Sequence, residues 1–317
     1  MNIRIDKIDL VKTIGILAVV LGHIGNPYSK YIYSWHMPLF FFIAGYLLKN
    51  NYQNCFSVIA NYAKKYFRIF VLANIAGILL ASLRNYFLAR EMLTWQEMLV
   101  DTFLYANSAP IAHYGFVLWF LPALFWAKSF FVWGSNSRNS WVAYILLLVI
   151  ASLYKFEFHN YLGIRAGLDA SLYVFLGYLY KQVENNIVLV RGLSIVALLA
   201  ILNLPIPDTN IQMGLYDNKI ISIVYALLNI VIIFNLVEII DRLLRGRFPI
   251  LSYLGKHSLQ IMILHVYTNN IAHIIVEKVL KQNYWQVKLL ISVLLSGLLL
   301  EGYYFIKGRI RYKAGII

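Results

Sequence analysis

Ten long apolar segments run through this chain and constrain its fold more than any other feature. A hydrophobic segment can cross a lipid bilayer only if its backbone groups are paired within it, which favours helices, and each crossing needs about 20 apolar residues. The sequence therefore predicts an all-α polytopic membrane protein with about ten transmembrane helices, in a single domain over residues 1–317. The predicted spans are residues 8–26, 33–48, 67–88, 116–134, 141–156, 166–181, 187–204, 219–241, 257–275 and 285–306.

The composition agrees with a membrane location. Hydrophobic residues make up 61% of the chain and charged residues 13%, whereas soluble domains carry about 25% charged residues. The net charge of +14 is no sign of nucleic acid binding, because the basic residues lie between apolar segments and not on a soluble face. We attribute it to contact with membrane lipids, and expect no nucleic acid partner. Cys55 is the only cysteine, so no intramolecular disulfide is possible.

The distribution of lysine and arginine predicts the orientation of the spans. With the N-terminus inside, sixteen of these residues fall in the cytoplasmic connections and chain ends, and eight fall on the other side. Cytoplasmic connections are normally the more positive ones, so both termini are predicted to be cytoplasmic. The longest outward connection is residues 89–115; another, NLPIPDTNIQMGLYDN, is predicted to be an ordinary surface loop.

The first predicted span carries polar residues that are expensive at membrane depth and so indicate a functional interior. His23 follows Lys12 by eleven residues, just over three helical turns, which places the two on one face about 16 Å apart. Asp9 lies three residues before Lys12, at a spacing that suits an ion pair. A plainer interpretation is that Lys12 reaches the cytoplasmic interface and His23 caps the outer helix end.

A second histidine, His36, opens the second predicted span. The short connection makes the two spans antiparallel neighbours, so His23 and His36 are predicted to face one another. A zinc site needs at least three protein ligands, and the chain has no HExxH or paired Cys/His spacing, so no metal is expected. The motifs GxSxG and GxxxxGK[ST] are also absent, which excludes α/β-hydrolase and P-loop chemistry.

Cations also precede the third predicted span, in the stretch KKYFR of residues 64–68. Lys65 and Arg68 are three residues apart on one helix face and suit a phosphate-bearing ligand. With Lys12 they would form a basic mouth, and a long anionic molecule would place its reactive end about 16 Å deeper, near His23. Asp169 and Glu301 are assigned structural ion pairs with Arg165, Arg191 or Lys288.

These residues belong to stretches that resemble a known family. RIDKIDLVKTIGILAVVLGH, followed by YSWHMPLFFFIAGYLL, resembles the opening of the acyltransferase 3 family of bacterial membrane proteins, particularly the branch related to fucose 4-O-acetylases. KKYFRIFV, VLWFLPALF, SLYVFLGYLYK and LSYLGKHSLQIMILH are similar to its later motifs. Such proteins lie in the bacterial inner membrane and transfer an acyl group, usually acetyl from cytoplasmic acetyl-CoA, to a hydroxyl of a lipid-linked or cell-surface sugar. Acetyl and succinyl both fit this sequence.

The chain departs from the family pattern at three positions. Lys12 stands where the family has an arginine, separated from the histidine by ten residues, so the charge survives but a bidentate phosphate contact is lost. Lys65 also replaces a usual arginine. Leu124 occupies a position where members with a fused soluble domain often carry glutamate. The chain is therefore expected to belong with the compact members.

The resemblance implies a role for each candidate residue. His23 would be the general base, and His36 would orient the acceptor or stabilise the oxyanion. Trp119 is either a sugar-stacking ring or an interfacial anchor, and His265 joins the polar interior or is a buried histidine bonded to a neighbouring helix. The outward residues 89–115 are expected to select the acceptor. The remaining candidates would bind the acyl-CoA donor: Asp9, Lys12, Lys65 and Arg68.

The main alternative is an exporter of a glycan or lipid-linked intermediate. Transporters commonly show repeat symmetry with interrupted helices in both halves. No such repeat is visible, and the polar residues concentrate in the first three predicted spans. A scaffold without chemistry would leave Lys12, His23 and His36 unexplained. The sequence therefore favours an enzyme.

Overall fold

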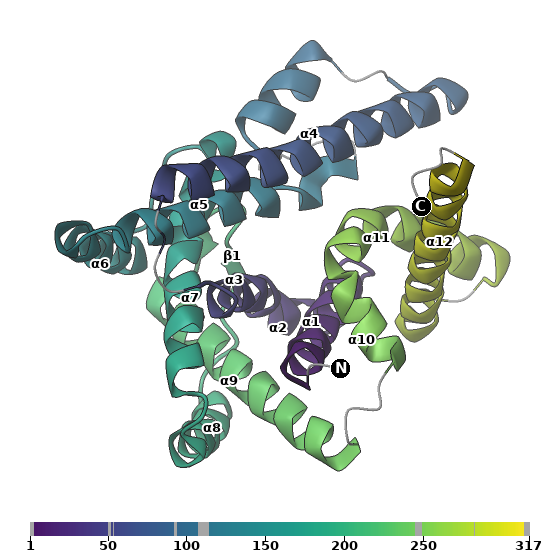
Figure 1. Ribbon diagram of the computed structural model, residues 1–317. Helices are drawn as coiled ribbons and strands as arrows, with labels where there is room; N and C mark the ends of the chain where they lie inside the picture. The colour runs from purple at the N-terminus through teal and green to yellow at the C-terminus, as the bar shows by residue number, and fades with distance from the viewer. Residues whose placement is uncertain are drawn as a thin grey trace. The chain divides into compact units, whose positions relative to one another are not determined.

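The computed structural model describes residues 3–49, 52, 54–91, 94–106, 114–244, 249–281 and 283–313. The chain divides into two compact units, each with its own interior. Unit 1 is Met1–Ile32 together with Ile240–Ile317, and unit 2 is Tyr33–Ile239. Figure 1 shows the helices of both along the chain.

Unit 1 joins the two ends of the chain. Its first helix packs against three helices from the C-terminal part, and the last two long helices pack along one another. These elements are α1 (Ile3–Gly22), α2 (Ser29–Tyr33, which ends at the unit boundary), α10 (Pro249–Lys256), α11 (Ser258–His273), the π-helical turn η4 (Ile274–Val279) and α12 (Trp285–Lys313).

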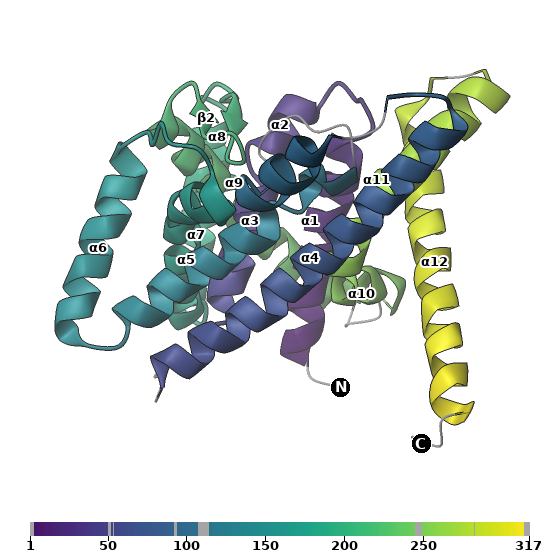
Figure 2. The same ribbon diagram turned by 90° about the horizontal axis from the view of Figure 1, so that it is seen from above.

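Unit 2 is built around one central helix, α7, which packs against α3 and α5; α5 in turn lies along α4 (Figure 2). The only strands among the described residues form one small antiparallel hairpin, in which Thr209 pairs with Tyr216 and Asn210 with Leu215. The elements of this unit are α3 (His36–Tyr46), α4 (Cys55–Phe87), η1 (Glu97–Leu104), η2 (Tyr114–Val117), α5 (Phe120–Gly134), α6 (Arg138–Leu153), η3 (Tyr161–Gly163), α7 (Ile164–Val183), α8 (Ile187–Ile201), β1 (Thr209–Asn210), β2 (Leu215–Tyr216) and α9 (Lys219–Leu244, which ends in unit 1).

The predicted helical fold is confirmed, since each predicted apolar segment contains a helix. Among the described residues, four helices are long and apolar enough to cross a membrane: Cys55–Phe87, Lys219–Leu243, Ser258–Val279 and Trp285–Lys307. The count of ten spans and the side of the termini stay predictions. Some residues used in these predictions lie outside the described residues or have side chains outside the description: 92–93, 107–113, Arg4, Arg245, Arg247, Arg309, Arg311 and Lys313.

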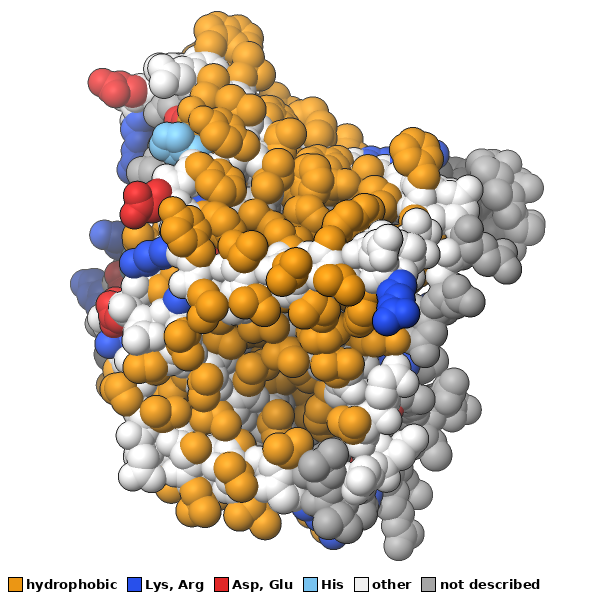
Figure 3. All heavy atoms as spheres, turned by 90° about the vertical axis from the view of Figure 1, so that its left-hand side faces the viewer, with side chains coloured by type: hydrophobic (Ala, Val, Ile, Leu, Met, Phe, Trp, Pro, Cys, Tyr) orange, Lys and Arg blue, Asp and Glu red, His pale blue; other side chains and the backbone are white. Residues whose placement is uncertain are grey.

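The surface of the helices is apolar where a membrane would contact it. Figure 3 shows a face on which hydrophobic side chains predominate, with charged side chains mainly toward its edges. On α4, for example, Leu72, Leu79 and Leu83 are more than half exposed, and on α6 so are Leu146 and Ile150. Contiguous apolar surface of this extent is rare on soluble monomers. Together with the four long apolar helices it identifies a membrane protein.

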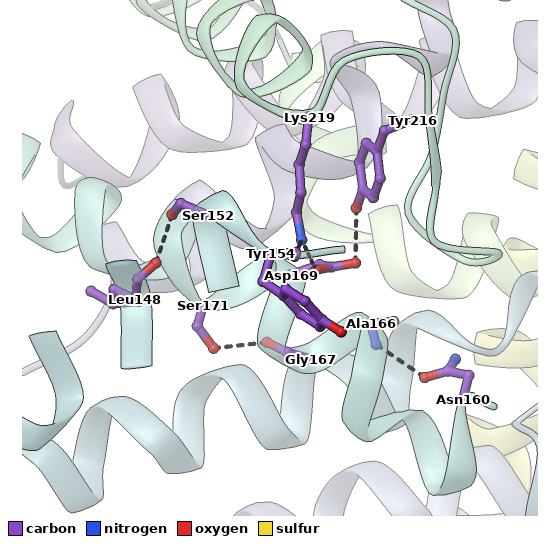
Figure 4. A network of polar contacts seen from close by, with 10 residues as sticks. All are labelled: Leu148, Ser152, Tyr154, Asn160, Ala166, Gly167, Asp169, Ser171, Tyr216 and Lys219. Carbon is purple, nitrogen blue, oxygen red and sulfur yellow. Dashed lines mark hydrogen bonds and ion pairs between the residues drawn. The ribbon is translucent and has the colours of Figure 1, made fainter. Parts of the chain in front are cut away.

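A buried ion pair joins the start of α9 to α7, and a hydrogen bond from the hairpin reaches the same carboxylate. Lys219 Nζ lies 2.5 Å from Asp169 Oδ1, and the Tyr216 hydroxyl donates to Asp169 Oδ2 at 2.9 Å (Figure 4). Burial raises the pKa of the Tyr216 hydroxyl well above its ordinary value, so this group stays protonated as a donor. The partner of Asp169 is therefore Lys219.

The predicted ion-pair partners of Asp169 were wrong, because its partner is Lys219. The expected cations lay within or beside spans, but Arg165 donates instead to the Gln212 carbonyl, at 2.6 Å. Lys288 pairs with Glu277 of the neighbouring π-helical turn. Partner choice follows from the packing of elements far apart in sequence, which the position of a charge within a span does not reveal.

Two glycines let α3 and α7 approach closely, and this yields a first testable prediction. A Cβ on Gly177 would collide with the Phe42 carbonyl oxygen, and a Cβ on Gly45 with the Val174 carbonyl oxygen. Because backbone atoms cannot move aside cheaply, Gly177→Ala should destabilise the protein by about 1–3 kcal/mol and lower its thermal midpoint in detergent. Gly192→Ala, where nothing lies within 4 Å of the added carbon, is the matched control. Equal midpoints for both variants would contradict this account of the contact.

Candidate active site

The first helix carries two of the candidate residues, Asp9 and Lys12, near its middle, and a third, His23, follows its last residue directly. Helix α1 is continuous from Ile3 to Gly22, so the helical spacing between Lys12 and His23 is kept. Lys12 Nζ lies 3.0 Å from Asp9 Oδ1, and the predicted ion pair is present. The carboxylate is buried, whereas the lysine side chain retains 24% exposure. The lysine is thus held at the surface of the unit by a carboxylate beneath it.

Helix α10 closes over the Asp9 end of α1. Gly255 permits this, because a Cβ there would collide with the Asp9 carbonyl oxygen. Thr13 Oγ1 donates to the same carbonyl at 2.9 Å and also contacts the Leu251 carbonyl of α10. Asp9 Oδ2 is buried and has no hydrogen-bond partner among the described residues. One carboxylate oxygen is therefore available to accept a further hydrogen bond.

At the other end of α1, two histidines from distant parts of the chain meet. The ring centroids of His23 and His265 are 5.2 Å apart, with 36° between the ring planes. His265 is fully buried in α11, and its Nδ1 lies 2.7 Å from the Met262 carbonyl oxygen. Because a carbonyl can only accept, the proton is assigned to Nδ1, which leaves Nε2 as the basic nitrogen of the neutral ring. The site therefore holds a pair of imidazoles.

A buried row of polar side chains supports this pair, and sequence reasoning missed it. Asn269 Nδ2 donates to the Val20 carbonyl of α1 at 3.2 Å, and Ser292 Oγ donates to Asn269 Oδ1 at 2.5 Å. Thr268 Oγ1 lies 2.8 Å from Ser292 Oγ and 3.0 Å from Ser296 Oγ. Interhelical hydrogen bonds of this kind hold membrane helices together. The available signal was the polar run TNN after His265 and two serines four residues apart in the last predicted span.

Four further candidates belong to unit 2. His36 opens α3, is buried, and its ring centroid lies 5.3 Å from that of Tyr33. Trp119 precedes α5 and is also buried, 6.3 Å from the ring of Phe41, so it is part of the packed interior of this unit. Because His23 and His36 belong to different units, their predicted juxtaposition stays a prediction.

The other two unit 2 candidates, Lys65 and Arg68, lie exposed on α4. Lys65 Nζ is 5.5 Å from the centroid of the Tyr66 ring. A further cation stands close by: Lys128 Nζ of α5 lies 3.2 Å from the Tyr66 hydroxyl and 4.0 Å from the centroid of the Tyr62 ring. Lys128 lies inside the predicted span of residues 116–134 and is not among the candidate residues. The basic surface of α4 is thus supplemented by α5, while its predicted meeting with Lys12 of unit 1 stays a prediction.

Across the described part of the chain, no three His, Cys, Asp or Glu side chains gather closely enough to hold a metal ion. Asp9 pairs with Lys12, and the ring of His23 lies beside that of His265. Their chemistry is that of hydrogen bonding and proton transfer by imidazole and carboxylate groups.

Comparison with known proteins identifies the family to which this arrangement corresponds. A family model described as an acyltransferase domain matches residues 5–302, nearly the whole chain. The match includes every candidate residue from Asp9 to His265. No curated protein and no solved structure matches the chain.

Proposed function

The chain belongs to this acyltransferase family, and from that premise we propose that it is a membrane O-acyltransferase that moves an acyl group from acyl-CoA to a sugar hydroxyl. We further propose acetyl as the acyl group, a lipid-linked or cell-surface glycan as the acceptor, and the bacterial inner membrane as the location. Membership supports acyl transfer in a membrane. We also propose that the protein belongs to the branch related to fucose O-acetylases. We propose that residues 1–317 form a single domain, and the family match supports this because it runs through both units.

The observation that carries the proposal is the arrangement on α1. The middle of this helix holds the Asp9–Lys12 pair, and His23, which directly follows its last residue, lies beside His265; a helical rise over eleven residues puts Lys12 and His23 about 16 Å apart. We assign Lys12, with Lys65 and Arg68, to the phosphates of the donor, since cations bind phosphate through charge-assisted hydrogen bonds. Asp9 keeps the Lys12 ammonium in place.

The proposed reaction is a direct acyl transfer. His23 accepts the proton of the acceptor hydroxyl as its oxygen attacks the thioester carbonyl carbon. The new C–O bond forms, the C–S bond breaks, and the CoA thiolate takes up the proton that His23 held, so the histidine is regenerated. His36 is proposed to stabilise the developing oxyanion or orient the acceptor, His265 to position His23, and Trp119 to contact the sugar.

The proposed function is tested by release of the CoA thiol from purified protein in lipid nanodiscs. We expect thiol release from acetyl-CoA that depends on added membrane glycan, and a parallel reaction with succinyl-CoA shows which acyl group is used. Release that needs no glycan would contradict the assigned acceptor class. The absence of release with every acyl-CoA and glycan fraction would contradict acyl transfer.

The assignment of Lys12 to the donor gives a second prediction. Lys12→Met should raise KM for acetyl-CoA by about 10- to 100-fold, because a hydrogen bond to a charged group contributes about 1.5–3 kcal/mol, while kcat changes little. Lys12→Arg should keep KM at or below the wild-type value, because a guanidinium binds phosphate in bidentate fashion. Lys256→Met, at an exposed lysine of the same unit, is the control. A kcat effect without a KM effect would overturn the assignment.

A further inference from the structure

A pocket in unit 2 has no role in the proposal above. It has a volume of about 530 Å³, within the usual range for small-molecule sites. Its walls come from the end of η1, from the connection between α6 and α7, and from the hairpin. We infer that this pocket binds a sugar ring of the acceptor, an inference that rests on the proposed function for its biological meaning.

The three parts of the chain that form the pocket share a predicted location. They fall within or beside three connections, residues 89–115, 157–165 and 205–218, and all three are predicted to lie on the outward side of the membrane. The structure brings these three connections together within one unit. The pocket is therefore placed, under that topology, on the side where a lipid-linked or surface glycan would be met.

The basic side chains of the pocket are engaged by the protein's own backbone. Lys155 Nζ donates to the Tyr216 carbonyl at 2.9 Å, and the buried Arg165 donates to the Gln212 carbonyl. The carboxylates of Asp101 and Glu157, which also line the pocket, form no ion pair or hydrogen bond with any residue that the structure describes. Because the cations already donate to backbone carbonyls, the two carboxylates make the pocket unfavourable for an anionic ligand. Their oxygens can accept hydrogen bonds from the hydroxyl groups of a ligand.

Aromatic rings supply the rest of the wall. Phe156 and Phe158 lie 5.6 Å apart between ring centroids, and the rings of His159 and Tyr105 are 5.1 Å apart. Phe158 is 42% exposed, so its face is accessible. A sugar ring combines an apolar C–H face, which packs on aromatic rings, with hydroxyl groups, which donate to carboxylates. This combination matches the pocket better than a purely apolar ligand does.

The backbone next to the pocket is held in unusual conformations. Ala106 and Leu162 have φ angles of 48° and 46°, in the left-handed region that non-glycine residues rarely adopt. Gly214 has φ 67°, and a Cβ there would collide with the Arg165 guanidinium. Such strain persists where surrounding contacts fix the backbone, and it clusters at functional sites. The unusual backbone conformations therefore lie beside the pocket, as is common at functional sites.

Direct binding of simple glycosides tests the inference. The full-length protein in nanodiscs is probed by saturation-transfer NMR with methyl glycosides of fucose, glucose and N-acetylglucosamine. We expect saturation of at least one of them. Phe158→Ala and Glu157→Gln should each weaken the affinity for that glycoside by at least about tenfold. Phe56→Ala, at a phenylalanine that is 83% exposed on α4, should bind as the wild type does. Equal affinity in the pocket variants, or no saturation by any glycoside, would overturn the inference.

The same variants separate this inference from the proposed function. Pocket variants that raise the KM for glycan, while KM for acetyl-CoA is unchanged, support the pocket as the acceptor site. Transfer with an unchanged KM for glycan in these variants would overturn the pocket and leave acyl transfer standing. Sugar binding that depends on Phe158 and Glu157, in a protein that releases no thiol from any acyl-CoA, would support the pocket and contradict acyl transfer.

Discussion

The His23→Ala variant is expected to transfer acyl groups about 10²- to 10⁴-fold more slowly than the wild-type protein. This is the usual contribution of a general acid or base, and alanine has no group that could accept the proton of the acceptor hydroxyl. The measurement is glycan-dependent thiol release from acetyl-CoA at equal protein levels. Binding of acetyl-CoA should be unchanged, because the cations proposed to bind its phosphates, Lys12, Lys65 and Arg68, are kept in this variant.

His273→Ala is the matched control for this experiment. His273 lies in the same unit, its side chain is 54% exposed, and its ring contacts Glu277, so its removal should leave the rate unchanged. An undiminished rate in His23→Ala would contradict the assignment of the base. The next candidate for the base would then be His265, whose ring centroid lies 5.2 Å from that of His23.

The Lys219→Met variant is expected to lose about 3–5 kcal/mol of the free energy of unfolding, because it leaves the Asp169 carboxylate buried without its counter-charge. The two side chains retain only 8% and 3% exposure, so water cannot replace the ammonium. The measurement is unfolding of the purified protein in mixed detergent. Lys64→Met, at an exposed lysine of the same unit, should change stability little.

A second variant separates the ion pair from other effects of the substitution. Replacing both partners, by Asp169→Leu with Lys219→Met, should recover most of the lost stability, since buried ion pairs contribute little relative to apolar replacements. The hydroxyl of Tyr216 would still lose its acceptor, so recovery should be incomplete. A loss below about 1 kcal/mol in the single variant, of the size measured for exposed pairs, would show that the pair is not buried as the structure has it.

Hydropathy was sufficient to predict the helices but not all of their ends. The third predicted span begins at residue 67, whereas α4 begins at Cys55. The reason is that a window of apolar residues detects the lipid-crossing part of a helix, while KKYFR continues the same helix outside it. Lys219 begins both the eighth predicted span and α9, but its pairing with Asp169, fifty residues earlier, was not predicted.

Within the candidate site, local geometry was predictable and distant contacts were not. The Asp9–Lys12 pair follows from a spacing of three residues on a helix. The contact of His23 with His265 joins residues 242 positions apart, and no spacing rule reaches across such a separation. The pocket of unit 2 has the same origin. Residues 89–115 alone were expected to select the acceptor, and no spacing rule shows that the other two connections meet them.

The most direct test of the central claim follows both halves of the donor at once. Membrane vesicles that contain the protein are given acetyl-CoA with one label in the acetyl group and a second in the CoA. The proposed function predicts that the acetyl label enters glycan as an alkali-labile ester while the CoA label stays in water, and that both events depend on His23. Glycan that crosses the membrane without gaining the acetyl label would contradict acyl transfer and favour export.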